Sequence, residues 1–523
     1  MKENNMKRIS AILLAAMLLL SGCAPAQLPP QVDTIDDNYR VFYHVFVGSF
    51  SDSNEDGIGD LRGLINRLDY INDGDVNSGT DLGAQGIWLS PIFSSPSYHK
   101  YDVRNYYKID SRFGSEEDLK ELAELCEQRN VKLILDLVLN HSSKQHPWFQ
   151  SFVAAHQSGD TSDPYYNFYT WVTADQKVSG RTYSSIVNSG GHFYECNFSG
   201  DMPELNLDNE EVRKACLEIA KYYLDLGVDG FRFDAIKYAH LGDTEKSAAF
   251  WKWYTDELRA MKPDIYTVGE CWGSDNETLA YTGGVNCFNF QMAQGEGFIA
   301  KAAKGGNLAT FTKYVESYQD RLLATREDAM MVNFIANHDT DRAAGFLTVS
   351  SGNMYMAANL YILCSGSPFI YYGEEIGMKG TRGGANTDAN RRLAMLWGDG
   401  DTVKDPVGTT FESEKQLNGT VAQQLKDENS LLRYYGRLIA MRNKYPAIAR
   451  GDYKALTFSE KNFGGFQITY GDSVIGLFHN NSTEEITVSL DGFSQLCDFI
   501  GLGNASFKDG VLVIGPHTSV IMQ

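Results

Sequence analysis

The 523-residue sequence is poor in positive charge, and after residue 20 it contains no long apolar run. Its 46 Lys and Arg residues are outnumbered by 67 Asp and Glu residues, so the formal net charge is -21. Phosphate binding needs clustered basic side chains, and we therefore expect no nucleic-acid partner. A neutral substrate or a bound cation is compatible with this charge.

Paired cysteines, internal repeats and low-complexity tracts are also missing. Seven cysteines follow Cys23, and no two of them form a CxxC pair: Cys126, Cys196, Cys216, Cys271, Cys287, Cys364 and Cys497. This scatter predicts neither a zinc site nor a disulfide framework. Most of these residues are expected to be small buried side chains.

The N-terminus predicts export. A basic start is followed by the apolar run 9–20, which is short for a membrane span and typical of a secretory signal. The sequence Leu-Ser-Gly-Cys at 20–23 resembles the bacterial lipobox, and a plain signal peptide is the alternative. The resemblance implies a signal peptide at 1–22, a lipid on Cys23 and a tether at 23–38. The protein would then be an exported, cell-surface lipoprotein anchored to a bacterial membrane.

From residue 39 to about 445, strand-like and helix-like segments alternate. The predicted strands lack strict polar alternation, as strands covered on both faces do, and lie at 41–47, 86–90, 131–139, 230–234, 266–269, 287–290, 331–335 and 369–372. Apolar residues at i, i+3 and i+4 predict helices at 116–128, 211–226, 250–261 and 354–363. Eight alternations favour a closed α/β (β/α)8 TIM barrel, and a doubly wound sheet is the alternative.

Two segments depart from this alternation. Residues 142–206 contain aromatic clusters and Gly-rich turns but no convincing barrel strand, which predicts a small domain inserted after strand 3. After a predicted helix at 431–443, short β-type runs separated by Asn, Asp and Gly predict an antiparallel β domain at 446–523.

Acidic and basic side chains follow the predicted strands at one end. Asp136 lies late in the third strand, Arg232 and Asp234 end the fourth, Glu270 ends the fifth, and 337–339 (Asn-His-Asp) follows the seventh. In a barrel these strand ends converge on one face, so we expect the side chains to meet there.

This set of groups suits the cleavage of an acetal bond. One carboxyl group must deliver a proton to the leaving oxygen, and another must supply electron density at the anomeric carbon. Arg232 precedes Asp234 by two residues, points the same way, and can hold that carboxylate ionised. Glu270 would act as the acid if an apolar wall or a negative charge keeps it protonated.

These segments strongly resemble the α-amylase family, glycoside hydrolase family 13, from about residue 40 into the C-terminal domain. The four short motifs of that family occur here in order. The resemblance implies a retaining mechanism on an α-glucan. Asp234 would be the nucleophile, Glu270 the general acid/base and Asp339 the transition-state stabiliser. The substrate-binding residues that it implies, including the Arg of the nucleophile strand, are Tyr101, His141, Arg232, Lys237, Tyr238 and His338.

The linkage and the subgroup follow from finer features. The segment 202–206 resembles the motif of members intermediate between oligo-1,6-glucosidases and neopullulanases, although Glu204 stands where Asp is usual. Ala235 and Lys237 resemble α-1,4-acting members, while Tyr238 replaces the usual His. We expect hydrolysis of α-1,4 bonds in starch or maltooligosaccharides, the α-amylase activity. An α-1,6-active, neopullulanase-type or transglycosylase-type member, or an inactive glucan-binding lipoprotein, is the alternative.

A loop after the first strand carries oxygen groups at alternate positions: Asp52, Asn54, Asp56, Ile58 (through its carbonyl) and Asp60. This is the ligand spacing of the first part of an EF-hand loop, without its terminal Glu. An Asp-rich turn is the alternative. In the family that the chain resembles, this loop binds calcium or magnesium, which implies a structural calcium here.

Overall fold

The computed structural model describes residues 37–412 and 415–523. The predicted signal peptide, the lipidation site Cys23 and all but the last two residues of the tether lie outside the described residues. Within the described part of the chain, no helix is long and apolar enough to span a bilayer.

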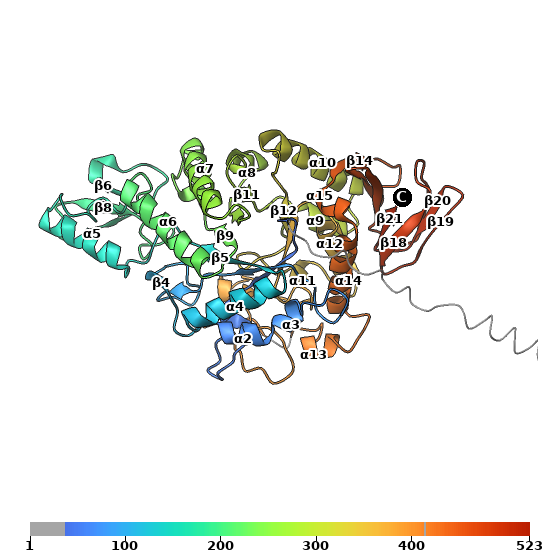
Figure 1. Ribbon diagram of the computed structural model, residues 1–523, viewed down its shortest axis with the longest axis horizontal. Coiled ribbons are helices and arrows are strands. Elements are labelled where there is room, and N and C mark those ends of the chain that lie inside the picture. Colours follow the sequence, from blue (N-terminus) through green and yellow to red (C-terminus); the bar gives the residue numbers. More distant parts are fainter. Residues whose placement is uncertain (1–36, 413–414) are drawn as a thin grey trace, which may run out of the picture.

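Eight parallel strands form the centre of the molecule (Figure 1). They pair in the order β11-β10-β9-β5-β2-β1-β13-β12, and a parallel bridge between Phe288 and Val332 joins the two ends of this sheet. The sheet is therefore closed, and the predicted barrel is confirmed over the doubly wound alternative. The strands are β1 (Phe42–Val45), β2 (Gly86–Leu89), β5 (Lys132–Leu137), β9 (Gly230–Phe233), β10 (Tyr266–Gly269), β11 (Asn286–Cys287), β12 (Val332–Phe334) and β13 (Ser367–Tyr371).

Helices surround these strands. They are α2 (Leu61–Asn66), α3 (Leu68–Ile71), α4 (Glu116–Gln128), α6 (Glu210–Asp225), α7 (Thr244–Met261), α8 (Asp275–Tyr281), α9 (Phe298–Ala303), α10 (Leu308–Thr325), α11 (Ala343–Phe346), α12 (Asn353–Ile362), α13 (Val421–Gln424) and α14 (Leu431–Lys444). Helix α7 begins six residues before the predicted start at 250. Its N-cap is Asp243, whose side chain accepts a hydrogen bond from the Lys246 N–H. This cap starts the helix before the amphipathic segment from which it was predicted.

Aromatic rings fill the inside of the barrel. The rings of Phe42 and Phe369 stack with centroids 4.7 Å apart, and Trp88, Tyr266 and Phe288 pack in the same buried cluster. Successive side chains of a strand point to opposite faces, so the residues two positions beyond the inward-facing ones also point inward. The polar groups at the ends of β5, β9 and β10 therefore lie on top of this apolar plug.

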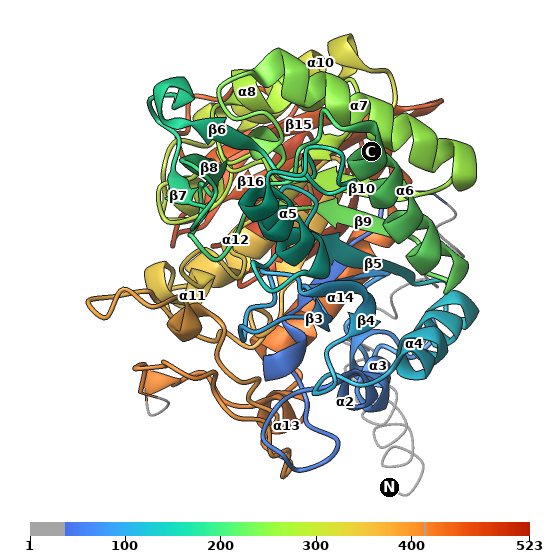
Figure 2. The same ribbon diagram turned by 90° about the vertical axis from the view of Figure 1, so that its left-hand side faces the viewer.

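The chain between β5 and α6 forms a small domain of its own, at the left of Figure 1 and facing the viewer in Figure 2. It contains α5 (Pro147–Ser158) and a three-stranded antiparallel sheet of β6 (Trp171–Thr173), β8 (His192–Glu195) and β7 (Tyr183–Ser185). An antiparallel bridge between His141 and Glu204 ties its two ends together at the barrel. The Asn140 amide also donates to the Glu204 carboxylate.

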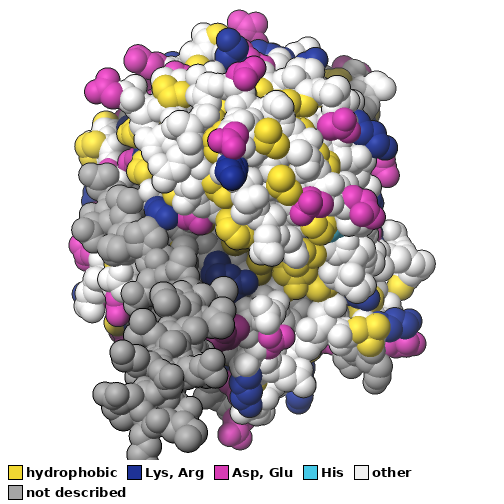
Figure 3. Space-filling model, turned by 90° about the vertical axis from the view of Figure 1, so that its right-hand side faces the viewer, with side chains coloured by type: hydrophobic (Ala, Val, Ile, Leu, Met, Phe, Trp, Pro, Cys, Tyr) yellow, Lys and Arg dark blue, Asp and Glu magenta, His cyan; other side chains and the backbone are white. Residues whose placement is uncertain are grey.

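Two antiparallel sheets form the C-terminal domain, at the opposite end of the molecule (Figure 1). It follows α15 (Pro446–Arg450) and contains β14 (Asp452–Leu456), β15 (Phe463–Tyr470), β16 (Ser473–Asn480), β17 (Ile486–Ser489), β18 (Leu496–Gly501), β19 (Ala505–Lys508), β20 (Val511–Ile514) and β21 (Thr518–Met522). Figure 3 shows this end of the molecule, where apolar side chains lie among charged ones of both signs. Tyr470, Val474, Phe499 and Leu502 are the large apolar residues exposed in this domain.

Candidate active site

A cavity of about 770 Å³ lies where the barrel, the inserted domain and the segment 386–392 meet. Three carboxylates from different strand ends share it, namely Asp234 after β9, Glu270 after β10 and Asp339 beyond β12. The other residues that line it are Tyr98, His99, Tyr101, His141, Phe198, Ser199, Met202, Ala235, Lys237, Tyr238, Trp272, Asn386, Thr387, Asp388 and Arg392.

Arg232 lies beneath this cavity and joins three carboxylates. Its guanidinium donates 2.8 Å to Asp136 and 2.7 Å to Asp234 through Nη1, and 2.5 Å to Glu270 through Nη2. The side chain is 1% exposed and is not among the residues that line the cavity. Sequence reasoning anticipated its pairing with Asp234, whereas the other two contacts follow from the register, which places Arg232 opposite Asp136 and Val268.

The Glu270 carboxyl has a pKa well above that of an ordinary glutamate. Burial raises its pKa to about 8, and the charges of Asp234 and Asp339 act in the same direction against the opposing effect of Arg232. Burial also raises the pKa of Asp136 to about 7, again against Arg232. Glu270 is therefore mostly protonated at neutral pH and able to deliver a proton.

Asp339 has the opposite environment. Burial tends to raise its pKa, but His338 and the Arg392 guanidinium hold the pKa well below its usual range. His338 Nε2 lies 3.1 Å from one Asp339 oxygen, and Arg392 Nη2 donates 2.7 Å to the other. Asp339 is thus an anion across the working range of pH, beside an acid that keeps its proton.

Tyr101, His141 and His338 complete the floor and wall of the cavity. The Tyr101 hydroxyl donates 2.9 Å to Asp136 and lies 2.5 Å from His338 Nε2, and its ring lies parallel to the His338 ring at 5.4 Å. Burial lowers the pKa of both His141 and His338, so both imidazoles are neutral near pH 7. His141 lines the cavity, whereas His338 is fully buried behind Tyr101 and Asp339.

Aromatic side chains form the rim. Phe198 is 45% exposed and its ring lies 4.5 Å from that of Tyr238, while Trp272 is 41% exposed and stacks on Phe290 at 4.7 Å. Lys237 Nζ donates 2.7 Å to the Trp272 carbonyl, so it is held at this rim. These flat apolar surfaces beside polar groups suit sugar rings.

Ala235 connects the nucleophile candidate to this rim in a strained conformation. Its φ of 48° lies in the left-handed region, which a non-glycine residue seldom adopts. The turn starts the short helix Ile236–Tyr238 directly after Asp234 and brings the Ala235 N–H to 3.4 Å from the Glu270 carboxylate. Strain of this kind concentrates at functional sites, where the surrounding structure maintains it.

Sequence reasoning placed the residues at strand ends but missed those delivered by loops. Arg392, Trp272, Phe198 and Tyr98 line the cavity, and none of them stands beside a predicted strand end except Trp272. Trp272, two residues after Glu270, carried the only usable signal. Arg392 follows a 3-10 turn at Asp388–Arg391, and nothing in its local sequence indicates that it pairs with Asp339.

The predicted metal loop lies outside this cavity. Asp52 accepts hydrogen bonds from the N–H groups of Asn54, Glu55 and Gly57, so the loop wraps around its carboxylate. Asp60 accepts from Ser53 and caps α2 through Gly63. Among the described residues, no group of three or more His, Cys, Asp or Glu side chains is arranged to hold a metal.

The family model "Alpha amylase, catalytic domain" matches residues 44–451, from the first strand to the start of the C-terminal domain. Alpha-amylase 3 of Dictyoglomus thermophilum is 33% identical, over 92% of this chain and 93% of its own length. An oligo-1,6-glucosidase of Parageobacillus thermoglucosidasius is 30% identical over 84% and 90%. A 4-alpha-glucanotransferase of Thermotoga maritima is 30% identical over 85% and 96%.

The solved structure of Eubacterium rectale Amy13B superposes with a TM-score of 0.87 and 32% identity, covering 95% of this chain and 97% of that one. The match of the family model to most of the chain agrees with the closed barrel and with three acids at its strand ends. The chain belongs to the α-amylase family of glycoside hydrolases and transglycosylases.

Proposed function

We propose that the protein is a retaining hydrolase of α-1,4-glucosidic bonds in starch or maltooligosaccharides. Asp234 attacks the anomeric carbon, and Glu270 gives its proton to the departing sugar oxygen. The resulting glycosyl ester on Asp234 is hydrolysed by a water from which Glu270, now ionised, takes a proton. Asp339 stabilises the positive charge that develops on the sugar ring.

One observation carries this proposal: the cavity holds Glu270, an acid with a pKa of about 8, beside Asp234, whose carboxylate accepts a hydrogen bond of 2.7 Å from Arg232. A carboxyl group that keeps its proton and a carboxylate paired with a guanidinium can perform the two roles that glycoside cleavage needs, those of acid and nucleophile. Arg232 contributes by pairing with Asp234, since a nucleophile must be ionised. The presence of all three acids speaks against an inactive glucan-binding protein.

The wall residues support a sugar ligand. His141 Nε2 is buried without a hydrogen-bond partner in the described structure, and His141 lines the cavity. A buried polar atom without a partner is costly, so a sugar hydroxyl at this position would relieve that cost. Tyr101 offers a ring face, and Lys237 and Tyr238 lie where the sugars beyond the cleaved bond would bind.

Preference for the α-1,4 bond rests on Ala235 and Lys237, and the names of the relatives span α-amylase, oligo-1,6-glucosidase and glucanotransferase. The discriminating experiment is a chromatogram of products from maltotriose, soluble starch and pullulan. We expect short reducing maltooligosaccharides from the first two substrates. Products longer than the substrate would make the enzyme a transglycosylase, and preferential cleavage of pullulan at its 1,6 bonds would overturn the linkage assignment.

We also propose a structural calcium ion at the loop 52–60. The donor set consists of hard oxygens, which is the chemistry that calcium prefers, and Gly57 with φ 89° permits the tight turn. Asp52, Asn54, Asp56, Ile58 and Asp60 would hold the ion, which would neutralise the carboxylates of this loop. Magnesium is the alternative.

For localisation, the lipobox-like sequence at 20–23 supports an exported lipoprotein, and labelling of Cys23 with a radioactive fatty acid tests it.

A further inference from the structure

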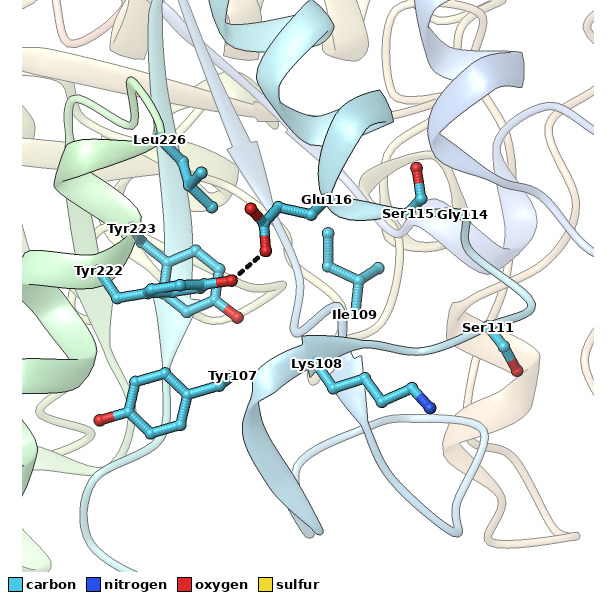
Figure 4. A pocket seen from close by; sticks show the side chains of 10 residues that line it. All are labelled: Tyr107, Lys108, Ile109, Ser111, Gly114, Ser115, Glu116, Tyr222, Tyr223 and Leu226. Atoms are coloured by element: carbon cyan, nitrogen blue, oxygen red, sulfur yellow. Dashed lines mark hydrogen bonds between the residues drawn. The ribbon is translucent and has the colours of Figure 1, made fainter.

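A second, smaller cavity of about 250 Å³ lies on the outside of the barrel (Figure 4). Its walls come from α6, from the start of α4 and from the edge strand β4 (Asn105–Ile109), which pairs with β3 (Phe93–Ser94). The lining residues are Tyr107, Lys108, Ile109, Ser111, Gly114, Ser115, Glu116, Tyr222, Tyr223 and Leu226. None of them lines the catalytic cavity.

Two pairs of adjacent tyrosines build this cavity. In each pair one ring is buried and supports the wall: Tyr106 donates to the carbonyls of Val138 and His141, and Tyr223 donates 2.5 Å to the Tyr106 carbonyl. The other ring of each pair faces outward. Tyr107 is 42% exposed, and Tyr222 is half-buried. The wall on α6 and the wall on β4 are therefore tied to each other and to the barrel.

The two outward rings form a fixed platform. Tyr107 and Tyr222 meet edge to face, with centroids 5.3 Å apart and an angle of 81° between their planes. The Tyr222 hydroxyl donates to the Glu116 carboxylate, as the dashed line in Figure 4 shows. Burial and this contact raise the pKa of Tyr222 to about 12, so the hydroxyl remains a neutral donor.

Lys108 and Glu116 are the charged residues that line the cavity, one of each sign, so the lining favours no ligand charge. The first turn of α4 carries Glu116, Glu117 and Asp118, and the Asp118 carboxylate already accepts the Ser115 N–H. The cavity therefore offers an aromatic face beside a carboxylate, an ammonium group and several hydroxyl groups. A carboxylate accepts hydrogen bonds at several positions, and hydroxyl groups both donate and accept them. This combination suits a neutral polyhydroxylated ring, which offers an apolar face and a rim of hydroxyl groups.

We propose that the Tyr107–Tyr222 cavity is a second, non-catalytic binding site for glucose rings of an α-glucan chain. The inference rests on the proposed function, because that function supplies the ligand. The cavity volume lies below the roughly 300–1,000 Å³ of sites that enclose a drug-sized ligand, so it accommodates one or two rings of a longer chain.

The position of this site favours long substrates. Tyr107 lies six positions after Tyr101 of the catalytic cavity, which bounds the distance between their Cα atoms at roughly 22 Å. Binding of one part of a polymer holds the rest near the catalytic cavity and raises its local concentration. Short oligosaccharides gain nothing from a second site. The site should therefore strengthen adsorption to starch and leave turnover of maltotriose unchanged.

The test compares Tyr107→Ala, Tyr107→Phe and the matched control Tyr470→Ala in the full chain. Tyr470 is 45% exposed at the end of β15 in the C-terminal domain, far from either cavity along the chain. Adsorption of each protein to insoluble starch granules is measured, together with kcat/KM on maltotriose. We expect Tyr107→Ala to weaken adsorption by about three- to tenfold, the effect of losing one aromatic contact. Tyr107→Phe, which keeps the ring, should adsorb within twofold of the wild type.

Three results would overturn the inference: wild-type adsorption of Tyr107→Ala, an equal loss in Tyr470→Ala, or a parallel loss of kcat/KM on maltotriose in Tyr107→Ala. Failure of the proposed function looks different, because the wild-type protein would then release no reducing sugar from maltotriose or starch. A melting temperature of Tyr107→Ala close to that of the wild type is expected, since the ring is 42% exposed and packs on Tyr222 at the molecular surface.

Discussion

Replacing Glu270 by Gln removes a titrating proton with little change in side-chain volume, and so isolates the acid role of this residue. Burial, aided by Asp234 and Asp339, raises the pKa of Glu270 from 4.5 to about 8. At pH 7 the protonated fraction is then roughly 90% rather than roughly 0.3%, a gain of roughly 300-fold or about 3 kcal/mol. This gain is lost in the variant, together with the proton transfer itself.

The assay compares two leaving groups through kcat/KM, which reports the first bond cleavage. On maltotriose the leaving sugar oxygen needs a proton, and general acid catalysis contributes roughly 10²–10⁴-fold, so we expect a loss of about 10³-fold. A nitrophenyl maltoside releases a phenolate that needs no proton, and there we expect at most about a tenfold loss. Glu296→Gln is the matched control, because the Glu296 side chain is 93% exposed.

The dependence on pH gives a second, independent signature of the same group. Wild-type kcat/KM on maltotriose should fall above about pH 8, because the acid then loses its proton. The Glu270→Gln variant on the aryl substrate should lack this basic limb. Equal losses on both substrates, or a basic limb that persists in the variant, would refute the acid assignment.

Further predictions concern the nucleophile, the metal loop and a buried carboxyl group outside the active site. Asp234→Asn should abolish turnover of maltotriose while circular dichroism remains that of the wild type, and substantial residual turnover would contradict the nucleophile assignment. Treatment with a chelator should lower the melting temperature, and added calcium should restore it, because a ligand that binds only the folded state stabilises it; an unchanged melting temperature would count against the loop 52–60. Burial raises the pKa of Glu374 from 4.5 to about 8, and its Oε1 accepts from the hydroxyls of Tyr361 and Tyr435. Between these two values the folded state binds more protons than the unfolded state, so stability falls as the pH rises from about 4.5 to 8. Glu374→Gln should match the wild type at pH 4.5 and exceed it by up to about 4 kcal/mol at pH 8 in urea unfolding, and parallel pH profiles would disprove this.

The barrel could be predicted because each strand is buried on both faces and therefore forms a short apolar run. β1, β2 and β10 are buried at every position, which explains why their sequences lack polar alternation. The C-terminal domain was harder to predict strand by strand. The apolar run of β18 is interrupted by Asp498, where its register shifts, and β19 alternates between half-buried and exposed residues with Ala505 and Phe507 as its apolar side chains.

The acids could be predicted for a geometric reason. Parallel strands end at one face, so a carboxylate that follows each of several strands must meet the others there. The same reasoning fails for Arg392, Phe198 and Tyr98, since loops have no period from which an orientation follows. The contacts of Arg232 could be predicted only in part. Its position two residues before Asp234 predicted that contact, whereas predicting its contacts with Asp136 and Glu270 would have required the register of three strands.

Counting charges explains why this site keeps a proton. Four buried or half-buried carboxyl groups, those of Asp136, Asp234, Glu270 and Asp339, share two guanidinium groups, of Arg232 and Arg392. Burial lowers the pKa of His141 and His338, so the imidazoles add no positive charge near pH 7. Two excess negative charges in a desolvated site are costly, and protons on two carboxyls remove that cost. The pKa values of about 7 for Asp136 and about 8 for Glu270 place the protons there. Of these two, only Glu270 lines the cavity, so the excess of carboxylates beneath the substrate supplies the acid that bond cleavage requires.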